Sequence, residues 1–202
     1  MNLAPYKHLL STDISDALPV GYAMEFAIAS VYSPPPRLMG FAYTVRCENR
    51  SNTYLHDAIY KAPKDAVIVA ETDGNDYAVA GGNVCAVAKA NGVAGFVVDG
   101  AVRDLGEIRE LGFPVYARGV FPKPGGKTDA GASKVEVVCG GVKVNTGDLI
   151  VADEEGIAVV PASSVEVVLA DALEKQQQNE AQSLDDWRAK HHTKILDVLK
   201  NK

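Results

Sequence analysis

Two spacings of apolar residues alternate along the first half of the chain. Short aliphatic runs bounded by charged or turn residues predict strands at residues 39–45, 66–70, 95–99 and 114–117. Helical spacing predicts helices at residues 12–18, 54–61, 83–91 and 104–111. Strands separated by helices pair in parallel, because each connection must cross over the sheet. The pattern therefore predicts a parallel α/β layer.

The pattern changes after Gly125 and Gly126 to strands joined by tight turns. Alternating runs flank Gly140 and Gly141, which predicts a hairpin, and two further runs lie within residues 145–161. Helical spacing returns at residues 163–180, and an amphipathic charged segment follows. This last segment either packs on its own domain or binds a partner or a neighbouring protomer.

These patterns predict an α/β fold with a layered domain of mixed parallel and antiparallel strands, unlike a doubly wound dinucleotide fold. We place this domain at residues 1–162 and a C-terminal helical extension at residues 163–202.

Charge and composition narrow the function. The 202 residues include 20 Lys and Arg against 26 Asp and Glu, a formal net charge of −6. A nucleic-acid-binding protein normally carries a basic stripe that neutralises phosphates, so we expect no nucleic-acid partner. The sequence contains no run of 18 apolar residues, so we expect no membrane-spanning helix. Polar residues interrupt the N-terminal segment too early for a signal peptide.

The cysteines point to a reducing compartment. Cys47, Cys85 and Cys139 are odd in number and form no CxxC pair, so neither a disulfide framework nor a cysteine zinc site is expected. We therefore expect a cytoplasmic protein.

A glycine pair precedes the predicted helix at residues 83–91. Gly81 and Gly82 lack a Cβ, so backbone N–H groups at this helix start can converge on an anion, with the helix dipole adding to the attraction. The alternative interpretation is a plain loop, because glycine pairs often serve only turn geometry.

A second candidate lies at the end of the predicted strand 95–99. Arg103 offers a planar fork suited to a carboxylate, and Asp104 is a hard oxygen ligand suited to Mg²⁺ or Mn²⁺. The alternative is structural: Asp104 caps the following helix, while Arg103 pairs with Asp99 or Glu107.

Several segments together resemble one known family. The sequence carries GGN before a helix, then GVAGFVVDGAVRD, ELGFPVYARG and CGGVKVNTGDLIVADEEGIAVVP in that order. This arrangement is similar to the RraA-like family, which includes 4-hydroxy-4-methyl-2-oxoglutarate aldolases and oxaloacetate decarboxylases. The resemblance runs from LSTDISDAL near the start through Pro161.

The resemblance implies a β/β/α swivelling-type fold, assembled as a homotrimer or a dimer of trimers with sites at the subunit edges. It also implies a divalent metal cation and a pyruvate-like 2-oxo acid substrate. In such a site the backbone around Gly81, Gly82, Asn83 and Val84 would hold the substrate carboxylate. Arg103 would be the catalytic residue that contacts the substrate, and Asp104 would be the metal ligand.

One position departs from the family's aldolases. They carry an acidic residue where this chain has Gly82, whereas some members with decarboxylase activity resemble the arrangement found here. The implied function is therefore a metal-dependent carbon–carbon lyase, with oxaloacetate decarboxylation ahead of retro-aldol cleavage. The alternative is a non-enzymatic regulator of a ribonuclease, as is the family's namesake.

Other reactive side chains carry weaker signals. His56 could reach the site, but a surface or core position is the expectation for a lone histidine. Cys85 follows the glycine pair, where a helix dipole could lower its pKa, yet an unpaired cysteine is usually a small buried residue. The acidic residues Asp153, Glu154 and Glu155 form either a solvated turn or extra ligands for a neighbouring subunit.

Overall fold

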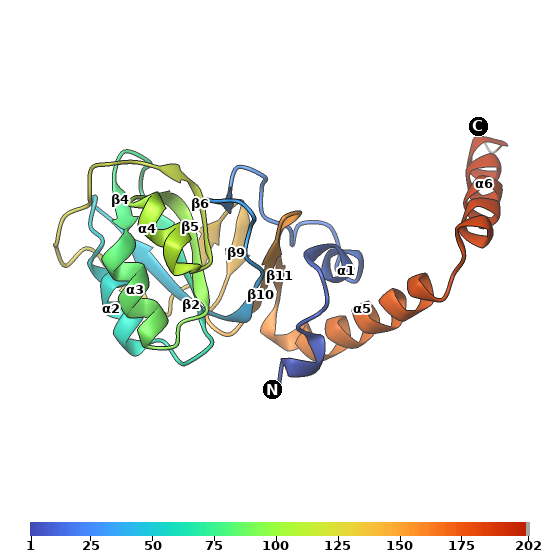
Figure 1. Cartoon of the computed structure of the whole chain (residues 1–202), viewed down its shortest axis with the longest axis horizontal. Helices are drawn as coiled ribbons and strands as arrows, with labels where there is room; N and C mark the ends of the chain where they lie inside the picture. Colours follow the sequence, from blue (N-terminus) through green and yellow to red (C-terminus); the bar gives the residue numbers. More distant parts are fainter. Residues whose placement is uncertain (201–202) are drawn as a thin grey trace.

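The computed structural model describes residues 1–200, built around one mixed sheet (Figure 1). The sheet has nine strands, and its main path runs β1-β6-β5-β3-β2-β10-β11, while β4 pairs with β5 and β7 with β2. The strands are β1 (Ala29–Ser30), β2 (Leu38–Cys47), β3 (Val67–Thr72), β4 (Ala78–Ala80), β5 (Gly95–Val102), β6 (Val115–Val120), β7 (Gly131–Ser133), β10 (Leu149–Asp153) and β11 (Gly156–Val160). The layered, mixed α/β fold is as the sequence predicts.

The centre of the sheet is parallel. Strands β2, β3, β5 and β6 pair in parallel, with Val69 opposite Val97 in the register of β3 and β5. Their residues are aliphatic on both faces, as expected for strands that are covered on both sides. The added strands β10 and β11 are antiparallel, which makes the sheet mixed.

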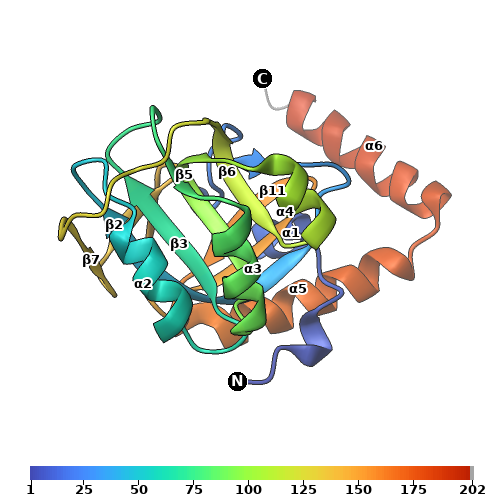
Figure 2. The ribbon, with the colours of Figure 1, turned by 60° about the vertical axis from the view of Figure 1, so that its left-hand side comes forward.

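Three helices cover one face of the parallel strands (Figure 2). They are α2 (Thr53–Lys61), α3 (Gly82–Ala90) and α4 (Leu105–Leu111). Leu55, Ala88 and Ile108 from these helices are fully buried against strand residues such as Phe96 and Val98. Gly112 ends α4 in the left-handed region with φ 62°, and Gly92 just beyond α3 has φ 85°, as expected for glycines that follow helix ends.

The opposite face is covered by a hairpin of β8 (Val137–Cys139) and β9 (Val142–Val144). Its turn is formed by Gly140 and Gly141, both with positive φ, so the predicted hairpin is confirmed. Val137 and Val144 pack with Val69 and Val97 of the sheet.

A third core lies beyond β10 and β11. There α1 (Ser11–Asp16) and the first half of α5 (Val165–Glu180) pack on the sheet through residues such as Ile14 and Leu169. Two short 3-10 helices precede these elements, at Ala4–Tyr6 and Ala162–Ser164. The start of the predicted C-terminal extension therefore shares a core with the sheet.

The last helix, α6 (Leu184–Lys200), stands apart from the sheet (Figure 1), and it differs from the other α-helices because none of its residues is buried. Leu184, Trp187 and Val198 are among its exposed apolar side chains. Residues 201 and 202 of the predicted extension lie outside the described part of the chain. Within residues 1–200, no helix combines the length and the apolar character that crossing a bilayer requires.

Candidate active site

The two sequence motifs meet at one edge of the sheet. Strand β4 ends at the glycine pair, and its parallel neighbour β5 ends just before Arg103. The Arg103 N–H donates to the Ala80 carbonyl at 3.0 Å, which ties the two strand ends together. Ligand-binding groups of α/β sheets commonly stand at the carboxyl ends of parallel strands, and this is such an edge.

Asp104 does not cap α4 through its side chain, although its carbonyl accepts the Ile108 N–H at 3.1 Å. It precedes α4, but its backbone is left-handed, with φ 59° and ψ 44°, and its side chain makes no capping hydrogen bond. Instead, its Oδ2 accepts the Gly82 N–H at 3.1 Å and lies 3.4 Å from Arg103 Nε. A left-handed backbone conformation costs a non-glycine residue about 1–2 kcal/mol of conformational free energy. At Asp104 this conformation accompanies a carboxylate that points toward the glycine pair.

Arg103 also pairs with neither Asp99 nor Glu107, the two residues of the structural alternative. Asp99 contacts Arg118 instead, and Arg103 pairs with the adjacent Asp104. The Arg103 and Asp104 side chains remain 41% and 34% exposed. Both therefore keep hydrogen-bonding capacity for a ligand.

The glycine pair makes room for carboxylates. A Cβ placed on Gly81 would lie 2.4 Å from Asp104 Oδ2, and one placed on Gly82 would lie 1.7 Å from Glu107 Oε2. Neither glycine has a positive φ, so close approach, not backbone conformation, requires glycine here.

A pocket of about 210 Å³ opens beside these groups. One wall contains Gly81, Asn83, Val84, Arg103 and Asp104, which are five of the six predicted site residues. Gly82 does not line it, and its N–H is taken by Asp104. The N–H groups of Asn83 and Val84 stand in the first turn of α3, where no earlier helical carbonyl can accept them.

The same pocket is also lined by three residues that were not predicted as site residues: Asn52, His56 and Lys127. Lys127 Nζ donates to Asn52 Oδ1 and lies 3.0 Å from His56 Nδ1, while His56 Nε2 lies 3.1 Å from the Val79 carbonyl. Since that carbonyl can only accept, Nε2 carries the proton and Nδ1 faces the lysine. Both ring nitrogens are thus engaged.

Burial shifts the titration of this pair. Burial lowers the pKa of His56, and the neighbouring Lys127 cation lowers it further, despite the opposing hydrogen bond to Val79. Burial also lowers the pKa of Lys127. At neutral pH His56 is therefore uncharged and accepts from the lysine.

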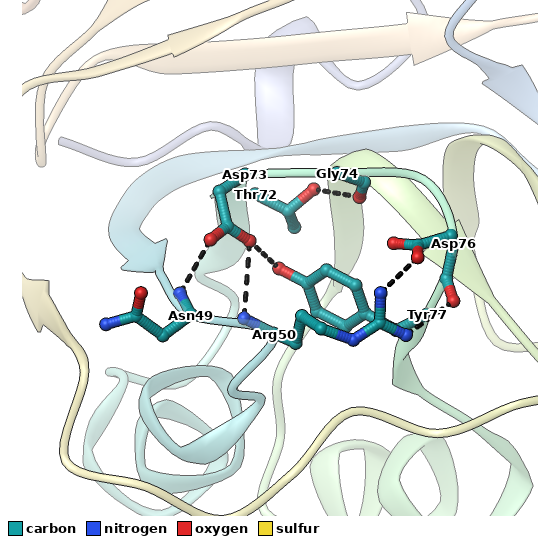
Figure 3. A network of polar contacts seen from close by, with 7 residues as sticks. All are labelled: Asn49, Arg50, Thr72, Asp73, Gly74, Asp76 and Tyr77. Atoms are coloured by element: carbon teal, nitrogen blue, oxygen red, sulfur yellow. Dashed lines mark hydrogen bonds and ion pairs between the residues drawn. The ribbon is translucent and has the colours of Figure 1, made fainter.

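Main-chain pairing and a polar network hold the loop that carries Lys127. Gly126 N–H donates to the Arg50 carbonyl at 2.8 Å, and Asn52 N–H donates back to the Gly126 carbonyl at 3.0 Å. Arg50 and Asn49 have positive φ, and the Asp73 carboxylate accepts both of their N–H groups (Figure 3). The loop position therefore depends on backbone geometry far from Lys127 in sequence.

The same network fixes Tyr77, whose hydroxyl donates to Asp73 at 2.5 Å (Figure 3). Burial alone would raise the pKa of Asp73, but hydrogen bonds from Tyr77, Asn49 and Arg50 outweigh it and lower the pKa. Arg50 additionally contacts Asp76 and lies over the Tyr77 ring. These hydrogen bonds and this ion pair thus hold the segment that leads into Asn52 of the pocket.

The donor set near the glycine pair fits a divalent cation. Among residues 1–200, no three His, Cys, Asp or Glu side chains converge as a metal cluster. Mg²⁺ and Mn²⁺ do not need one, because they commonly use one or two carboxylates and retain several waters. Asp104 is a half-exposed carboxylate in a cradle that a Cβ at Gly81 would fill, so it suits such an ion.

The remaining candidates lie elsewhere or are structural. Burial, with a smaller contribution from Asp104, raises the pKa of Cys85 to about 12, so this thiol is not activated. Asp153 is buried and accepts the Ser11 N–H and hydroxyl at 2.7 and 2.6 Å.

A larger cavity, of about 750 Å³, lies away from this site. It lies where β3 and β5 begin, among Ala66, Ala94 and the N-terminal segment, at the other end of the parallel strands. None of the predicted site residues lines it.

The chain is similar in sequence to known proteins of one family. A family model described as "RraA-like: Aldolase/RraA" matches residues 11–159. A protein of Halalkalibacterium halodurans, provisionally named 4-hydroxy-4-methyl-2-oxoglutarate aldolase, is 37% identical over 89% of this chain and 85% of its own length.

Solved structures share the fold. The RNA-processing inhibitor RraA from Thermus thermophilis superposes with a TM-score of 0.69 at 31% identity, over 75% of this chain and 92% of its own. An uncharacterized protein from Pseudomonas syringae gives a TM-score of 0.77 at 27% identity, over 93% of this chain and 92% of its own. The family model covers the glycine pair, Arg103 and Asp104, and with these matches it shows that the chain belongs to the RraA-like family.

Proposed function

We propose that this protein is a divalent-metal-dependent carbon–carbon lyase acting on short 2-oxo acids, with oxaloacetate decarboxylation ahead of retro-aldol cleavage of 4-hydroxy-4-methyl-2-oxoglutarate. One observation carries the proposal. The Asp104 carboxylate is turned away from capping α4 and toward the glycine pair, beside Arg103 and the pocket. A purely structural aspartate at a helix start would cap it.

The residues of the pocket have distinct roles in this proposal. The Asn83 and Val84 N–H groups bind the substrate carboxylate next to the 2-oxo group, aided by the dipole of α3. Arg103 donates to the 2-oxo oxygen, where negative charge develops as the bond breaks. Asp104 holds Mg²⁺ or Mn²⁺, which supplies Lewis-acid polarisation of the 2-oxo group when bound.

Both substrates are dicarboxylates, and Lys127 suits the second carboxylate. It places a cation in the lining of the same pocket, and His56 and Asn52 hold it there. Lys127 thus serves to bind and orient the second carboxylate, which in oxaloacetate is the group that leaves as CO₂.

Decarboxylation ranks first because the pocket wall lacks a free base. Loss of CO₂ moves its bonding electrons onto the 2-oxo oxygen and needs no base. Retro-aldol cleavage must also remove the proton of the 4-hydroxyl group. His56 is the nearest neutral base, but Val79 and Lys127 already engage both of its ring nitrogens.

The test is pyruvate release from oxaloacetate and from 4-hydroxy-4-methyl-2-oxoglutarate, each with Mg²⁺ and with EDTA. We expect turnover of oxaloacetate above the rate with Mg²⁺ alone, and its loss in EDTA. If neither substrate turns over above the metal-only background, the lyase proposal is wrong.

A regulator is the second candidate, because the similar protein from Thermus thermophilis is named as an inhibitor of RNA processing. The same preparation distinguishes the two. A protein that binds a ribonuclease and turns over neither substrate would support the regulator.

A further inference from the structure

The cavity of about 750 Å³ lies at the end of the parallel strands remote from Arg103 and Asp104. It is found where β2 changes partners: residues 38–41 pair with β10, and pairing with β3 starts only at Ala42. The connection from α2 to β3 lines the same space with residues 63–66. Small-molecule sites commonly occupy about 300–1,000 Å³, so this cavity has the size of a ligand site.

The floor of the cavity is apolar. Leu38, Ala42 and Val151 are buried strand residues that line it, and Met39 and Phe41 are partly buried beside them. An aliphatic or aromatic group placed on this floor would be withdrawn from water, which favours binding in proportion to the apolar area buried.

The rim of the cavity is basic. Five basic residues line the cavity against one acidic residue, Asp65, although the chain as a whole has 26 Asp and Glu against 20 Lys and Arg. The basic residues of the rim are all exposed: Lys7, Arg37, Lys61, Lys64 and Lys134. Such a local reversal of the overall charge attracts an anion.

Most of these cations are not neutralised by the protein. Within residues 1–200, Lys61 alone among the five pairs with a carboxylate, that of Asp57 at 2.8 Å. Arg37 donates to the Leu9 carbonyl, which carries no charge. The positive charge of the rim is therefore available to a ligand.

We propose that this cavity is a second ligand site, which binds a small amphiphilic anion: an apolar body on the floor and a carboxylate or phosphate at the rim. The cavity shares no lining residue with the candidate active site, so the inference does not rest on the proposed function. Helix α6 of another copy is a poor occupant, because its four basic and three acidic residues do not complement a basic rim.

The dye 8-anilinonaphthalene-1-sulfonate tests the site, because it joins an aromatic body to an anionic group and fluoresces in apolar surroundings. We expect saturable binding to the whole folded protein, weakened by KCl and unaffected by EDTA. Its uncharged relative N-phenyl-1-naphthylamine lacks the sulfonate and reports on the floor alone. Absence of saturable binding of the anionic dye overturns the inference.

Removing two cations tests the rim. Lys64→Gln combined with Lys134→Gln should weaken binding of the anionic dye by about 10-fold, as expected when two exposed ion pairs are lost, and leave the uncharged dye unaffected. The matched control combines Lys143→Gln with Lys190→Gln, two exposed lysines that do not line the cavity, and should bind both dyes like the wild type. Equal losses in the two variants would reflect net charge only and contradict the proposal.

Two further measurements locate the dye. Oxaloacetate with Mg²⁺ should not displace it, and Trp187→Ser in α6 should not change its affinity. Displacement would place the dye in the candidate active site, and loss of affinity would place it on α6; either result overturns the inference, whether or not the protein is a lyase.

Competition then identifies the head group. Octanoate and octyl phosphate should displace the dye, and the tighter of the two shows whether the rim prefers a carboxylate or a phosphate. Octanol at the same concentration should displace much less, since it lacks the charge. Equal displacement by octanol, or none by either anion, would refute a site for amphiphilic anions.

Discussion

Two aspartates, one within β5 and one just beyond it, each pair with an arginine, and they differ in how completely each is hydrogen-bonded. Asp99 in β5 contacts Arg118, accepts the Gly140 N–H at 2.8 Å, and is only 16% exposed. Asp104 just beyond β5 accepts one N–H, lies 3.4 Å from its arginine and is 34% exposed. The Asp99–Arg118 pair joins the β8–β9 hairpin to the sheet, whereas Asp104 beside Arg103 keeps unused lone pairs that a ligand can contact.

The difference also appears in the backbone. Asp99 lies within β5 opposite Glu71 of β3, and Glu25 adds a second acid to Arg118. Asp104 holds a left-handed conformation without a glycine's freedom. Strain at an incompletely bonded carboxylate is a feature of functional sites, while complete bonding is typical of structural ones.

The largest expected effect comes from Asp104. Asp104→Ala should lower metal-dependent pyruvate release by about 10³-fold, because a cation's Lewis-acid contribution is worth several kcal/mol. The variant should stay folded but lose about 1–3 kcal/mol of unfolding free energy, because the buried Gly82 N–H loses its acceptor and alanine tolerates the left-handed backbone less well than aspartate. Steady-state kinetics in Mg²⁺ and thermal unfolding check both parts; wild-type kinetics in the variant would contradict them.

Arg103 ranks next. Arg103→Lys keeps the charge but loses the planar fork, so we expect kcat to fall by about 10²-fold with a smaller change in KM. An equal rise of KM at constant kcat would show that Arg103 serves binding and not the developing charge.

Asp99 should behave in the opposite way. Asp99→Asn leaves Arg118 without its main partner, and we expect a loss of about 2 kcal/mol of unfolding free energy, less than for a fully buried pair because water reaches it. Its kcat should stay within about twofold of wild type. Urea unfolding alongside kinetics measures both, and a variant that is stable but inactive would erase the distinction between the two pairs.

The smallest effect concerns pH. Burial and Lys127 lower the pKa of His56 in the folded protein. As pH falls, His56 is therefore protonated at a higher pH in the unfolded chain than in the folded one. The wild type should therefore lose stability as pH drops below the ordinary histidine value of about 6.5. In His56→Gln, melting temperatures measured between pH 7 and 5 should fall less steeply, and an unchanged slope would show that His56 does not contribute.

Much of the fold was predictable because its signals are local. Aliphatic runs, helical spacing and the glycines at positions 92, 112 and 140 marked most central elements within a few residues. Strands β1, β4 and β7 were missed, because two or three residues carry no periodicity and become strands only by pairing. β5 also runs on to Val102, past the predicted end at Asp99, because β4 and β6 pair with its last residues.

The candidate site likewise has parts that local sequence motifs indicate and parts that only packing brings together. The sequence by itself determined the glycine pair and the Arg103–Asp104 pair, since each is a compact motif at the end of a strand. Only the tertiary structure placed His56 and Lys127 in the same pocket, turned the Asp104 side chain away from capping the helix it precedes, and brought Glu107 against Gly82. Side-chain direction and contacts between distant segments depend on packing that no local spacing records, so these features become visible only once the chain is folded.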